Sequence, residues 1–538
     1  MAKRAASICK RPAAKPRAVA KQPSTGSIRP TKPRAGAKQP STSSIHPPDE
    51  PDVSTWAVPV AGPMEPAYAD HFVEMLIEQL RHLPQHMNIN MWADCAGTVS
   101  EAVAAEKIAD AIWRRLRLKV TITLLGACDN NKASEKVARV DRSAKHFSRD
   151  IFDRDFAAGT FRCEICDGDE PMPTDGVDVY VCCFPCSPWS KLGQRLGFNT
   201  KASSVVWQAI KTIGHMKPCF FFFENVVTLQ SSRSNDDDLD LAVIEQYVAK
   251  HLIHHSTSIL KGICPTQAGY PVKKTRLAIV GWRKGVVHED AVPACLRKLF
   301  TNPIGVASDF RHFLGLRDCP TLIEKLNRVG ELPRADESDF LTRAGCACGI
   351  DPWCVCPIHL CKCKHCKLHG NGSKKCSWRA AAADYLQKRI PQLLENPSTA
   401  HAVTYIQALE LADRKTPTSA RERNLLNIFA RSVKAQPLYS TTANCDISQT
   451  IQFSHIKADG TVGTMSTGSV IFSFRDGMAL TVPMMAKLMG RNVMEVTAPG
   501  VTECQFKMML GMSFHPASAG LLIAAMLGAV GMKTEQPL

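Results

Sequence analysis

The sequence lacks a long uncharged apolar segment, and this absence limits the class of protein. Its most apolar stretch, 520–528, is bracketed by His515, Pro516 and Lys533. It falls short of the roughly 18 apolar residues that a membrane-spanning helix needs. We therefore expect a buried helix there and no membrane partner. With 538 residues, 45% hydrophobic and 22% charged, the chain is long enough to bury sizeable cores in two or three domains.

Acidic residues are absent from 1–47, which carry eleven Lys and Arg. Subtracting eleven from the net charge of +16 leaves +5 for 48–538. A basic segment suits a polyanionic partner because binding releases counterions from phosphates, although a solvated tail or an address signal has the same composition. The segment repeats, since KPRAVAKQPSTGSIRPT (15–31) returns as KPRAGAKQPSTSSIHPP (32–48). Its Pro, Ser and Lys content predicts a disordered tail over 1–50.

A secretory signal is also lacking, because no apolar core and small-residue cleavage site follow the basic N-terminus. We therefore expect the 22 cysteines to stay reduced, in the nucleus or the cytosol. The nucleus is our prediction. An organelle is the alternative, because the N-terminal segment also has the Arg-rich, Ser-containing and acid-poor composition of a transit peptide.

Short apolar runs alternate with helical patterns between residues 65 and 285. The strand candidates are 89–92, 120–127, 177–183, 219–223 and 276–282, and the helix candidates between them are 100–116, 202–216 and 240–254. This alternation predicts an α/β fold with a parallel, doubly wound sheet and helices on both faces. Ligands of such sheets collect at the carboxyl ends of the strands.

The alternation stops near residue 286, and helical patterns return over 481–490 and 511–527, the second with Pro516 near its start. We predict one α/β domain in two parts, 65–285 and 466–530. An insertion over 286–465 separates these parts.

The insertion contains a dense cysteine cluster. Cys-x-Cys and Cys-x-x-Cys pairs at this density predict zinc in a reducing compartment. The predicted ligands are Cys346, Cys348, Cys354, Cys356, Cys361, Cys363, Cys366 and Cys376. A tetrahedral site needs four ligands, so eight thiolates suit two ions, or three if sulfurs bridge. Lysines between the cysteines suit phosphate contact, although a purely structural clip has the same pattern.

The segment VCCFPCSPWS (181–190) contains Cys183-Phe-Pro-Cys186 after an apolar run. That pattern suits a redox pair, half a metal site or one nucleophilic cysteine. Two later segments favour the nucleophile, because FFFFENV (220–226) ends a strand with Glu224 and YPVKKTRLAIVG (270–281) brings Arg276 into another. A thiol, an acid and a cation at neighbouring strand ends suit covalent attack on an electron-poor ring. Cys183 is then a packing residue. A separate Cys163-Glu-Ile-Cys166 is compatible with two ordinary loop cysteines.

The order and spacing of these pieces resemble the cytosine-5 DNA methyltransferase family over about 90–285 and 470–530. The resemblance implies a Rossmann-like methyltransferase domain interrupted by a zinc-binding target-recognition insertion. It also implies a monomer that acts on duplex DNA. Cys186 would attack carbon 6 of a cytosine flipped out of its duplex. Glu224 would bond ring nitrogen 3, and Arg276 the carbonyl oxygen of the base.

The same resemblance implies a pocket for the methyl donor S-adenosylmethionine. Its residues are Asp94 and Gly97 of the DCAG turn, Asp129, the pair Asp150 and Ile151, Pro185 beside the nucleophile, and Ser513 of GMSF (511–514). A carboxylate at a strand end commonly binds ribose hydroxyls. Five positions depart from the family pattern: Cys95, Ser187, Val272, Lys274 and Met512.

Three functions remain compatible with these patterns. They are a DNA cytosine methyltransferase, a transfer RNA cytosine methyltransferase of the same fold, and a non-catalytic zinc-containing DNA-binding protein on a degenerate methyltransferase scaffold. The basic tail and the large insertion favour the first. The altered donor turn favours the third, whereas Cys186, Glu224 and Arg276 oppose it.

Overall fold

The computed structural model describes residues 67–193, 195–232, 239–305, 309–324, 442–449, 456–492 and 498–533, together with several positions between 409 and 429. Two predicted features lie outside these described residues: the basic tail over 1–50 and the cysteine cluster over 346–376.

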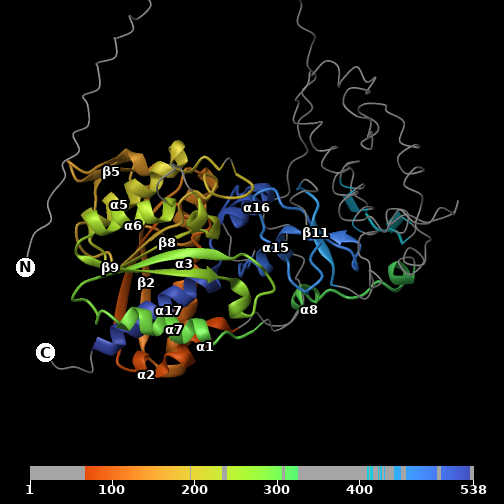
Figure 1. Cartoon of the computed structure of the whole chain (residues 1–538), viewed down its shortest axis with the longest axis horizontal. Helices are drawn as coiled ribbons and strands as arrows, with labels where there is room; N and C mark the ends of the chain where they lie inside the picture. Colours follow the sequence, from red (N-terminus) through yellow and green to blue (C-terminus); the bar gives the residue numbers. More distant parts are fainter. Residues whose placement is uncertain are drawn as a thin grey trace, which may run out of the picture. The chain divides into compact units, whose positions relative to one another are not determined.

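Seven strands form the central sheet, in the order β3-β2-β1-β7-β8-β10-β9 (Figure 1). The strands are β1 His86–Asp94, β2 Lys119–Cys128, β3 His146–Ser148, β7 Val179–Cys182, β8 Phe220–Val226, β9 His255–Ile263 and β10 Arg276–Arg283. Strands β3, β2, β1, β7 and β8 pair in parallel, whereas β10 is antiparallel to both of its neighbours, β8 and β9. The expected α/β sheet is confirmed.

The expectation that every strand is parallel is wrong at β10. This strand follows β9 along the chain and lies beside it in the sheet. Antiparallel neighbours need no helical crossover, so a loop reverses the chain between them. The alternation of strands and helices breaks at this point, and β3 and β9 were not predicted from the sequence.

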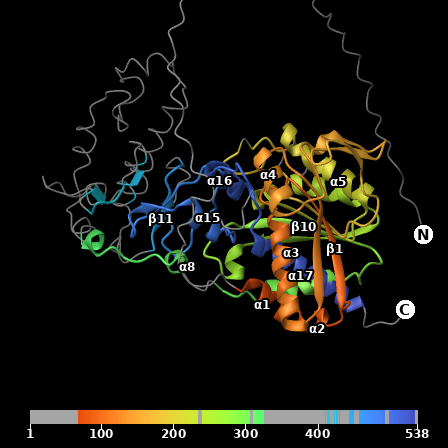
Figure 2. The same cartoon turned by 180° about the vertical axis from the view of Figure 1, so that it is seen from behind.

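Helices cover both faces of the sheet (Figures 1 and 2). The core on one face includes α1 Tyr68–Met75, α2 Ile77–Leu80, α3 Ser100–Leu116, α7 Ala291–Thr301 and α17 Pro516–Lys533, and the core on the other includes α5 Val205–Met216 and α6 Asp240–His251. The helices expected over 100–116, 202–216 and 240–254 are therefore present, the last two with shorter bounds. Helix α7 packs against α17, although its residue numbers fall in the expected insertion.

The two cores explain why the strands read as continuous apolar runs. Successive strand residues point to opposite faces, so a strand buried on both sides needs apolar side chains throughout. In β8, Phe220 and Phe222 lie in one core and Phe221 and Phe223 in the other.

Helix α17 begins at Pro516 and its side chains are buried from Ala517 to Ala529. The buried helix predicted here is therefore confirmed. In the described part of the chain, no single helix is long and apolar enough to cross a membrane. The bent pair of α16 Glu503–Met512 and α17 meets the length and composition criteria together.

Two smaller antiparallel sheets flank the central one. The first, of β4 Arg154–Asp155, β5 Thr160–Cys163 and β6 Gly168–Pro171, follows β3 directly. It is joined to β3 by a hydrogen bond of 2.7 Å from the Glu164 amide to the Phe147 carbonyl. The second consists of β11 Asn444–Asp446, β12 Ile471–Ser473 and β13 Met478–Ala479. Arg311 of α8 (Phe310–Leu314) anchors the loop between β12 and β13 through a buried ion pair with Asp476, at 2.7 Å.

Candidate active site

One edge of the sheet collects nearly all the segments that the sequence analysis singled out. The parallel strands β1, β2, β3, β7 and β8 end there, and each is followed by a predicted site segment. Strand β10 begins at this edge because it runs the opposite way, with Ala278 opposite Glu224 and Arg276 opposite Val226. The reversal of β10 therefore brings Arg276 to the carboxylate.

Glu224 and Arg276 form an ion pair of 2.6 Å between Oε1 and Nε, and their side chains are only 8% and 10% exposed. Burial raises the pKa of Glu224, while Arg276 and then Lys274 oppose the rise. A carboxyl group with a raised pKa is better suited to hold and donate a proton than an ordinary glutamate.

The segment after β7 makes a tight turn around the Cys186 carbonyl. This oxygen accepts hydrogen bonds from the amides of Trp189, at 2.9 Å, and Ser190, at 2.8 Å. Gly193 closes the turn, and a Cβ atom there would lie 1.9 Å from the Ser187 carbonyl oxygen. Only glycine fits this approach without moving the backbone.

Two buried side chains fix this nucleophile loop to its surroundings. The indole of Trp189 donates to Asp240 of α6 at 2.8 Å, and the amide of Asn225 donates to the Phe184 carbonyl at 3.0 Å. Asn225 lies next to Glu224 in β8, so the loop and the carboxylate are held in fixed register. This arrangement explains why asparagine follows the glutamate.

Cys186 is an exposed free thiol, and Cys183 is a half-buried one. The protein atoms around Cys186 raise the pKa of its thiol, whereas Arg276 and Lys274 act to lower it. Burial raises the pKa of Cys183 well above its usual value, and its thiol donates a hydrogen bond to Glu224. Of these two sulfurs, Cys186 is the one placed to react.

Lys274 lies inside the site, and the sequence marked it only as a departure from the family pattern. Its ammonium donates to the carbonyls of Ser513 at 2.5 Å and Gly511 at 3.2 Å. Burial, and then the nearby Arg276, lower its pKa to about 7. Lys274 thus connects the segment between α16 and α17 to the catalytic strand edge.

Asp94 anchors the start of the donor turn. Its buried carboxylate accepts from Arg154 at 2.5 and 2.6 Å, from the Trp92 indole at 3.0 Å and from the Tyr180 hydroxyl. These four bonds occupy both carboxylate oxygens. Arg154 is fully buried and was not identified from the sequence, because an arginine in a short strand carries no local signal of its partner.

The rest of the donor turn is held by polar contacts between its own members. Gly97 has a φ of +54° and its amide donates to Asp129 at 2.8 Å. The Ser513 hydroxyl lies 2.8 Å from the Thr98 hydroxyl and donates to the Met509 carbonyl at 2.7 Å. Burial raises the pKa of Asp129, and the Gly97 amide opposes this effect.

The remaining predicted residues follow strands that end at the same edge of the sheet. Asp150 follows β3 and accepts from the Phe152 amide at 3.0 Å, which caps the short helix Ile151–Asp153. Ile151 is buried, and Pro185 is half-buried directly before Cys186. Asp94, Asp129 and Asp150 thus stand at the ends of three adjacent strands.

Glu101 is a site residue that the sequence analysis missed. It is 2% exposed, and its Oε1 has no hydrogen-bond partner among the described residues. Burial raises its pKa to about 7, and Arg491 opposes the rise. Its position on the buried stripe of α3, with Ile108 and Ile112, was the available signal. A buried carboxyl group with one oxygen free of partners among the described residues suits a ligand that carries cationic groups, as S-adenosylmethionine does.

Comparisons with known proteins agree with the motifs. Residues 143–304 match the family model for C-5 cytosine-specific DNA methylase, which confirms the resemblance predicted from the sequence. The matched range includes Cys186, Glu224 and Arg276.

Two curated relatives are each 28% identical to the chain, over 116 and 106 residues: the type II methyltransferases M.PspPI of Psychrobacter sp. (strain TA137) and M.BsuFI of Bacillus subtilis. Each alignment covers 20% of this chain and 24% of the relative, so the chain spans about a quarter of their length. The solved Dnmt2 methyltransferase of S. pombe overlaps 82% of this chain and 98% of its own, with 13% identity and a TM-score of 0.37.

Proposed function

We propose that the chain transfers a methyl group from S-adenosylmethionine to carbon 5 of cytosine in duplex DNA. The proposal starts from the match of residues 143–304 to the family model for C-5 cytosine-specific DNA methylase. The observation that carries the proposal is the buried ion pair of Glu224 and Arg276 beside the exposed thiol of Cys186. A base in the duplex stack cannot reach these groups, so the proposal includes flipping of the target cytosine.

The chain's own residues divide the work at the base. Cys186 loses its proton and forms a bond to carbon 6, and the electrons of the 5,6 double bond shift through carbon 4 onto nitrogen 3. Glu224 donates its proton to nitrogen 3, which holds that charge, while Arg276 bonds the carbonyl oxygen. Carbon 5 becomes nucleophilic as a result. After carbon 5 has been methylated, a solvent base removes its proton. The electrons of that bond re-form the 5,6 double bond and expel the Cys186 sulfur as a thiolate, while nitrogen 3 returns its proton to Glu224.

The charged groups around Cys186 and Glu224 suit attack by the thiolate on carbon 6 together with protonation of nitrogen 3. The thiol of Cys186 has a raised pKa, so it rests in the protonated form. Arg276 and Lys274 both stabilise a thiolate at this position. Burial likewise raises the pKa of Glu224, while Arg276 and Lys274 oppose the rise. Neighbouring protein atoms therefore raise the pKa values of both groups, and the two cations act against that rise.

The donor supplies an electrophilic methyl group when it is bound. Asp129 and Asp150 are the carboxylates that would hold its ribose and adenine, and Glu101 provides a buried carboxylate for a cationic group. Gly97 allows close approach of the turn, and Ser513 closes the pocket from the C-terminal side through Thr98.

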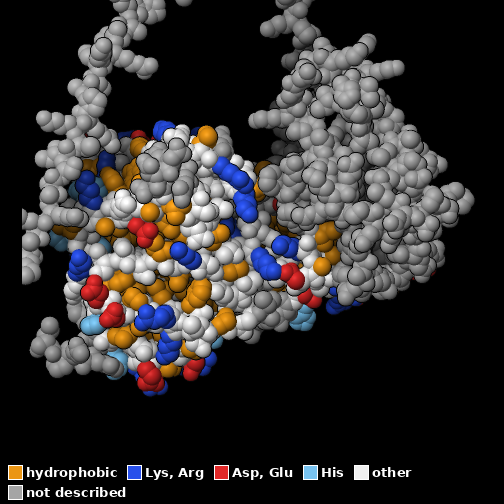
Figure 3. Space-filling model, in the orientation of Figure 1, with side chains coloured by type: hydrophobic (Ala, Val, Ile, Leu, Met, Phe, Trp, Pro, Cys, Tyr) orange, Lys and Arg blue, Asp and Glu red, His pale blue; other side chains and the backbone are white. Residues whose placement is uncertain are grey.

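The proposal also covers parts of the chain outside the described residues. We propose that the cysteines at 346–376 bind structural zinc in the target-recognition insertion, and that the basic tail contacts the DNA backbone in the nucleus. Lys and Arg side chains are spread over the face in Figure 3, with acidic side chains between them. Residues 1–47 of the tail, by contrast, have eleven basic residues and no acidic one, which favours the tail as the phosphate contact.

The decisive experiment traps the covalent adduct. The purified chain is incubated with S-adenosylmethionine and a duplex carrying 5-fluorocytosine in several sequence contexts, and the products are resolved under denaturing conditions. Fluorine cannot leave carbon 5 as a proton does, so a working enzyme stays bound to the DNA. We expect a stable adduct with the unaltered chain.

Two variants serve as controls in this experiment. Cys186→Ala should give no adduct, whereas Cys504→Ser should behave like the unaltered chain because Cys504 is an exposed cysteine of α16, away from the reacting groups. An adduct with fluorinated transfer RNA and none with DNA would replace DNA by RNA as the substrate. Donor binding without any adduct on either nucleic acid would exclude the covalent reaction.

A further inference from the structure

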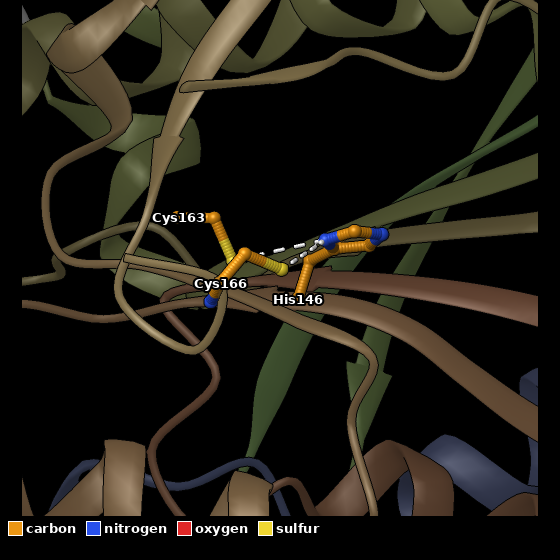
Figure 4. A group of neighbouring side chains, drawn as sticks. All are labelled: His146, Cys163 and Cys166. Carbon is orange, nitrogen blue, oxygen red and sulfur yellow. Dashed lines mark hydrogen bonds between the residues drawn. The ribbon is translucent and has the colours of Figure 1, made fainter. Parts of the chain in front are cut away.

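A second group of chemically competent side chains is formed by residues that the proposed reaction does not use (Figure 4). His146 is the first residue of β3, Cys163 is the last residue of β5, and Cys166 lies in the turn that leads to β6. The sulfur atoms of the two cysteines and a ring nitrogen of the histidine all lie within 4.8 Å of one another. Three residues from two separate sheets therefore meet at one point.

The distances fit a tetrahedral metal site. Nδ1 of His146 lies 3.5 Å from the Cys166 sulfur and 3.7 Å from the Cys163 sulfur. Zinc bonds of about 2.3 Å to sulfur and about 2.0 Å to nitrogen, at a tetrahedral angle, separate the two ligand atoms by roughly 3.6 Å. The three side chains are thus already spaced as ligands of one ion.

Two contacts fix the positions of these side chains. The Cys166 amide donates to the Cys163 sulfur at 3.4 Å. Phe161 packs edge-on against the His146 ring, with centroids 5.7 Å apart, and so fixes the orientation of the imidazole. Both features hold the ligands in place before any ion arrives.

A fourth position and an entry path are also present. Glu170 of β6 is half-buried and its carboxyl group interacts with the Cys166 side chain. Zinc accepts a carboxylate oxygen or a water molecule as its fourth ligand. Cys163 is buried whereas Cys166 is exposed, so an ion can reach the site from solvent.

We propose that His146, Cys163 and Cys166 bind one structural Zn²⁺ ion, with Glu170 or water as the fourth ligand. The ion would join the hairpin of β5 and β6 to β3, in addition to the bond from Glu164 to Phe147 and the ion pair from Arg149 to Glu164. Strand β3 leads directly to Asp150, so the ion would also steady that carboxylate. The site uses none of the cysteines at 346–376 and does not depend on methyl transfer.

Zinc content of the full-length chain tests the proposal. The protein is loaded with zinc, dialysed, and analysed by elemental mass spectrometry. The double variant C163S/C166S should hold one zinc ion fewer per chain than the unaltered protein, and His146→Ala should bind this ion more weakly. Cys504→Ser is the matched control, since it removes an exposed cysteine elsewhere and should lose no zinc.

A measurement on the unaltered chain keeps the test independent of how the variants fold. Alkylation of Cys166 is followed by peptide mass spectrometry, with zinc present and after chelation. We expect alkylation to be roughly tenfold or more slower with zinc, because a bound thiolate is not a free nucleophile. Equal alkylation rates would overturn the proposal, as would a disulfide between Cys163 and Cys166 in protein purified without reductant.

Discussion

The candidate active-site edge has a target side, around Cys186, and a donor side, around Asp94. The two sides differ in how exposed and how hydrogen-bonded their polar groups are. On the target side, Cys186 is exposed. Glu224 is paired with Arg276, and Lys274 is a second cation near the carboxylate. On the donor side, Asp94 is bonded on both oxygens within a fully buried network. One half keeps its reactive groups available, and the other uses its polar groups to hold the backbone in shape.

This difference bears on how substitutions in the two halves should act. Residues that touch a reacting base can be replaced only with loss of chemistry, whereas a turn held by several mutual hydrogen bonds tolerates other residues if the bonds are kept. Cys95 and Met512 belong to the tolerant half. Substitutions on the target side should therefore reduce turnover, and those on the donor side should first reduce stability.

The largest effect is expected from Glu224→Gln. Glutamine keeps the size and one acceptor but has no proton to give to ring nitrogen 3, so turnover should fall by about 10²- to 10⁴-fold. Methyl incorporation into DNA under single-turnover conditions measures this loss. Glu245→Gln, which changes an exposed carboxylate of α6, is the control and should retain full turnover. A small loss in E224Q would remove Glu224 from the chemistry.

The next effect concerns stability and is expected from Asp94→Asn. The substitution leaves the Arg154 guanidinium buried without its anionic partner, which costs about 3 to 5 kcal/mol in the free energy of unfolding. Urea unfolding measures this change. Glu78→Gln breaks an exposed ion pair with Arg81 and should cost less than about 1 kcal/mol. Similar losses in the two variants would contradict the assignment of Asp94 as the anchor of the turn.

A third prediction concerns pH, through Lys274, which belongs to both halves. Its folded-state pKa is lowered to about 7 from a usual value of 10.5. Between these values the unfolded chain binds the extra proton, so this lysine makes stability rise with pH, by about 1 kcal/mol for each pH unit. Below pH 7 both states are protonated and the lysine adds no pH dependence.

Lys274→Met should remove that rise. We expect the unfolding free energy of the unaltered chain to gain on that of K274M between pH 7 and pH 10, and the two curves to run parallel below pH 7. Lys119→Met, an exposed lysine at the start of β2, is the control and should leave the pH dependence unchanged. Parallel curves for K274M above pH 7 would show that Lys274 titrates normally.

Much of the fold followed from the sequence because its signals are local. The apolar runs of β1, β2, β7 and β8 and the periodicity of α3 lie within short windows, and α3 has the predicted bounds. The direction of β10 could not be predicted in this way, because parallel and antiparallel strands buried on both faces have the same apolar pattern. Strand β3 is too short, at three residues, to show any pattern.

The candidate site likewise contains residues with local sequence signals and residues whose partners are distant in the sequence. Cys186, Glu224 and Arg276 lie within recognisable motifs, and the structure brings Glu224 and Arg276 into contact. Arg154 bonds Asp94, 60 residues away, and Lys274 bonds Ser513, 239 residues away, so no short segment contains either pair. The metal-ligand spacing of Cys163 and Cys166 was visible in the sequence, but His146 joins them only through the pairing of sheets.

The smallest predicted effect tests the donor half alone. Ser513→Ala removes the hydroxyl that contacts Thr98 and should weaken donor binding by about fivefold, which corresponds to roughly 1 kcal/mol. Isothermal titration with S-adenosylmethionine measures this affinity. Ser518→Ala is the matched control, because its buried hydroxyl has no hydrogen-bond partner among the described residues. If both variants bound the donor equally well, the contact between Ser513 and Thr98 would not shape the pocket. If only S513A lost affinity and kept its adduct yield at saturating donor, the donor half would be shown to act through shape and the target half through chemistry.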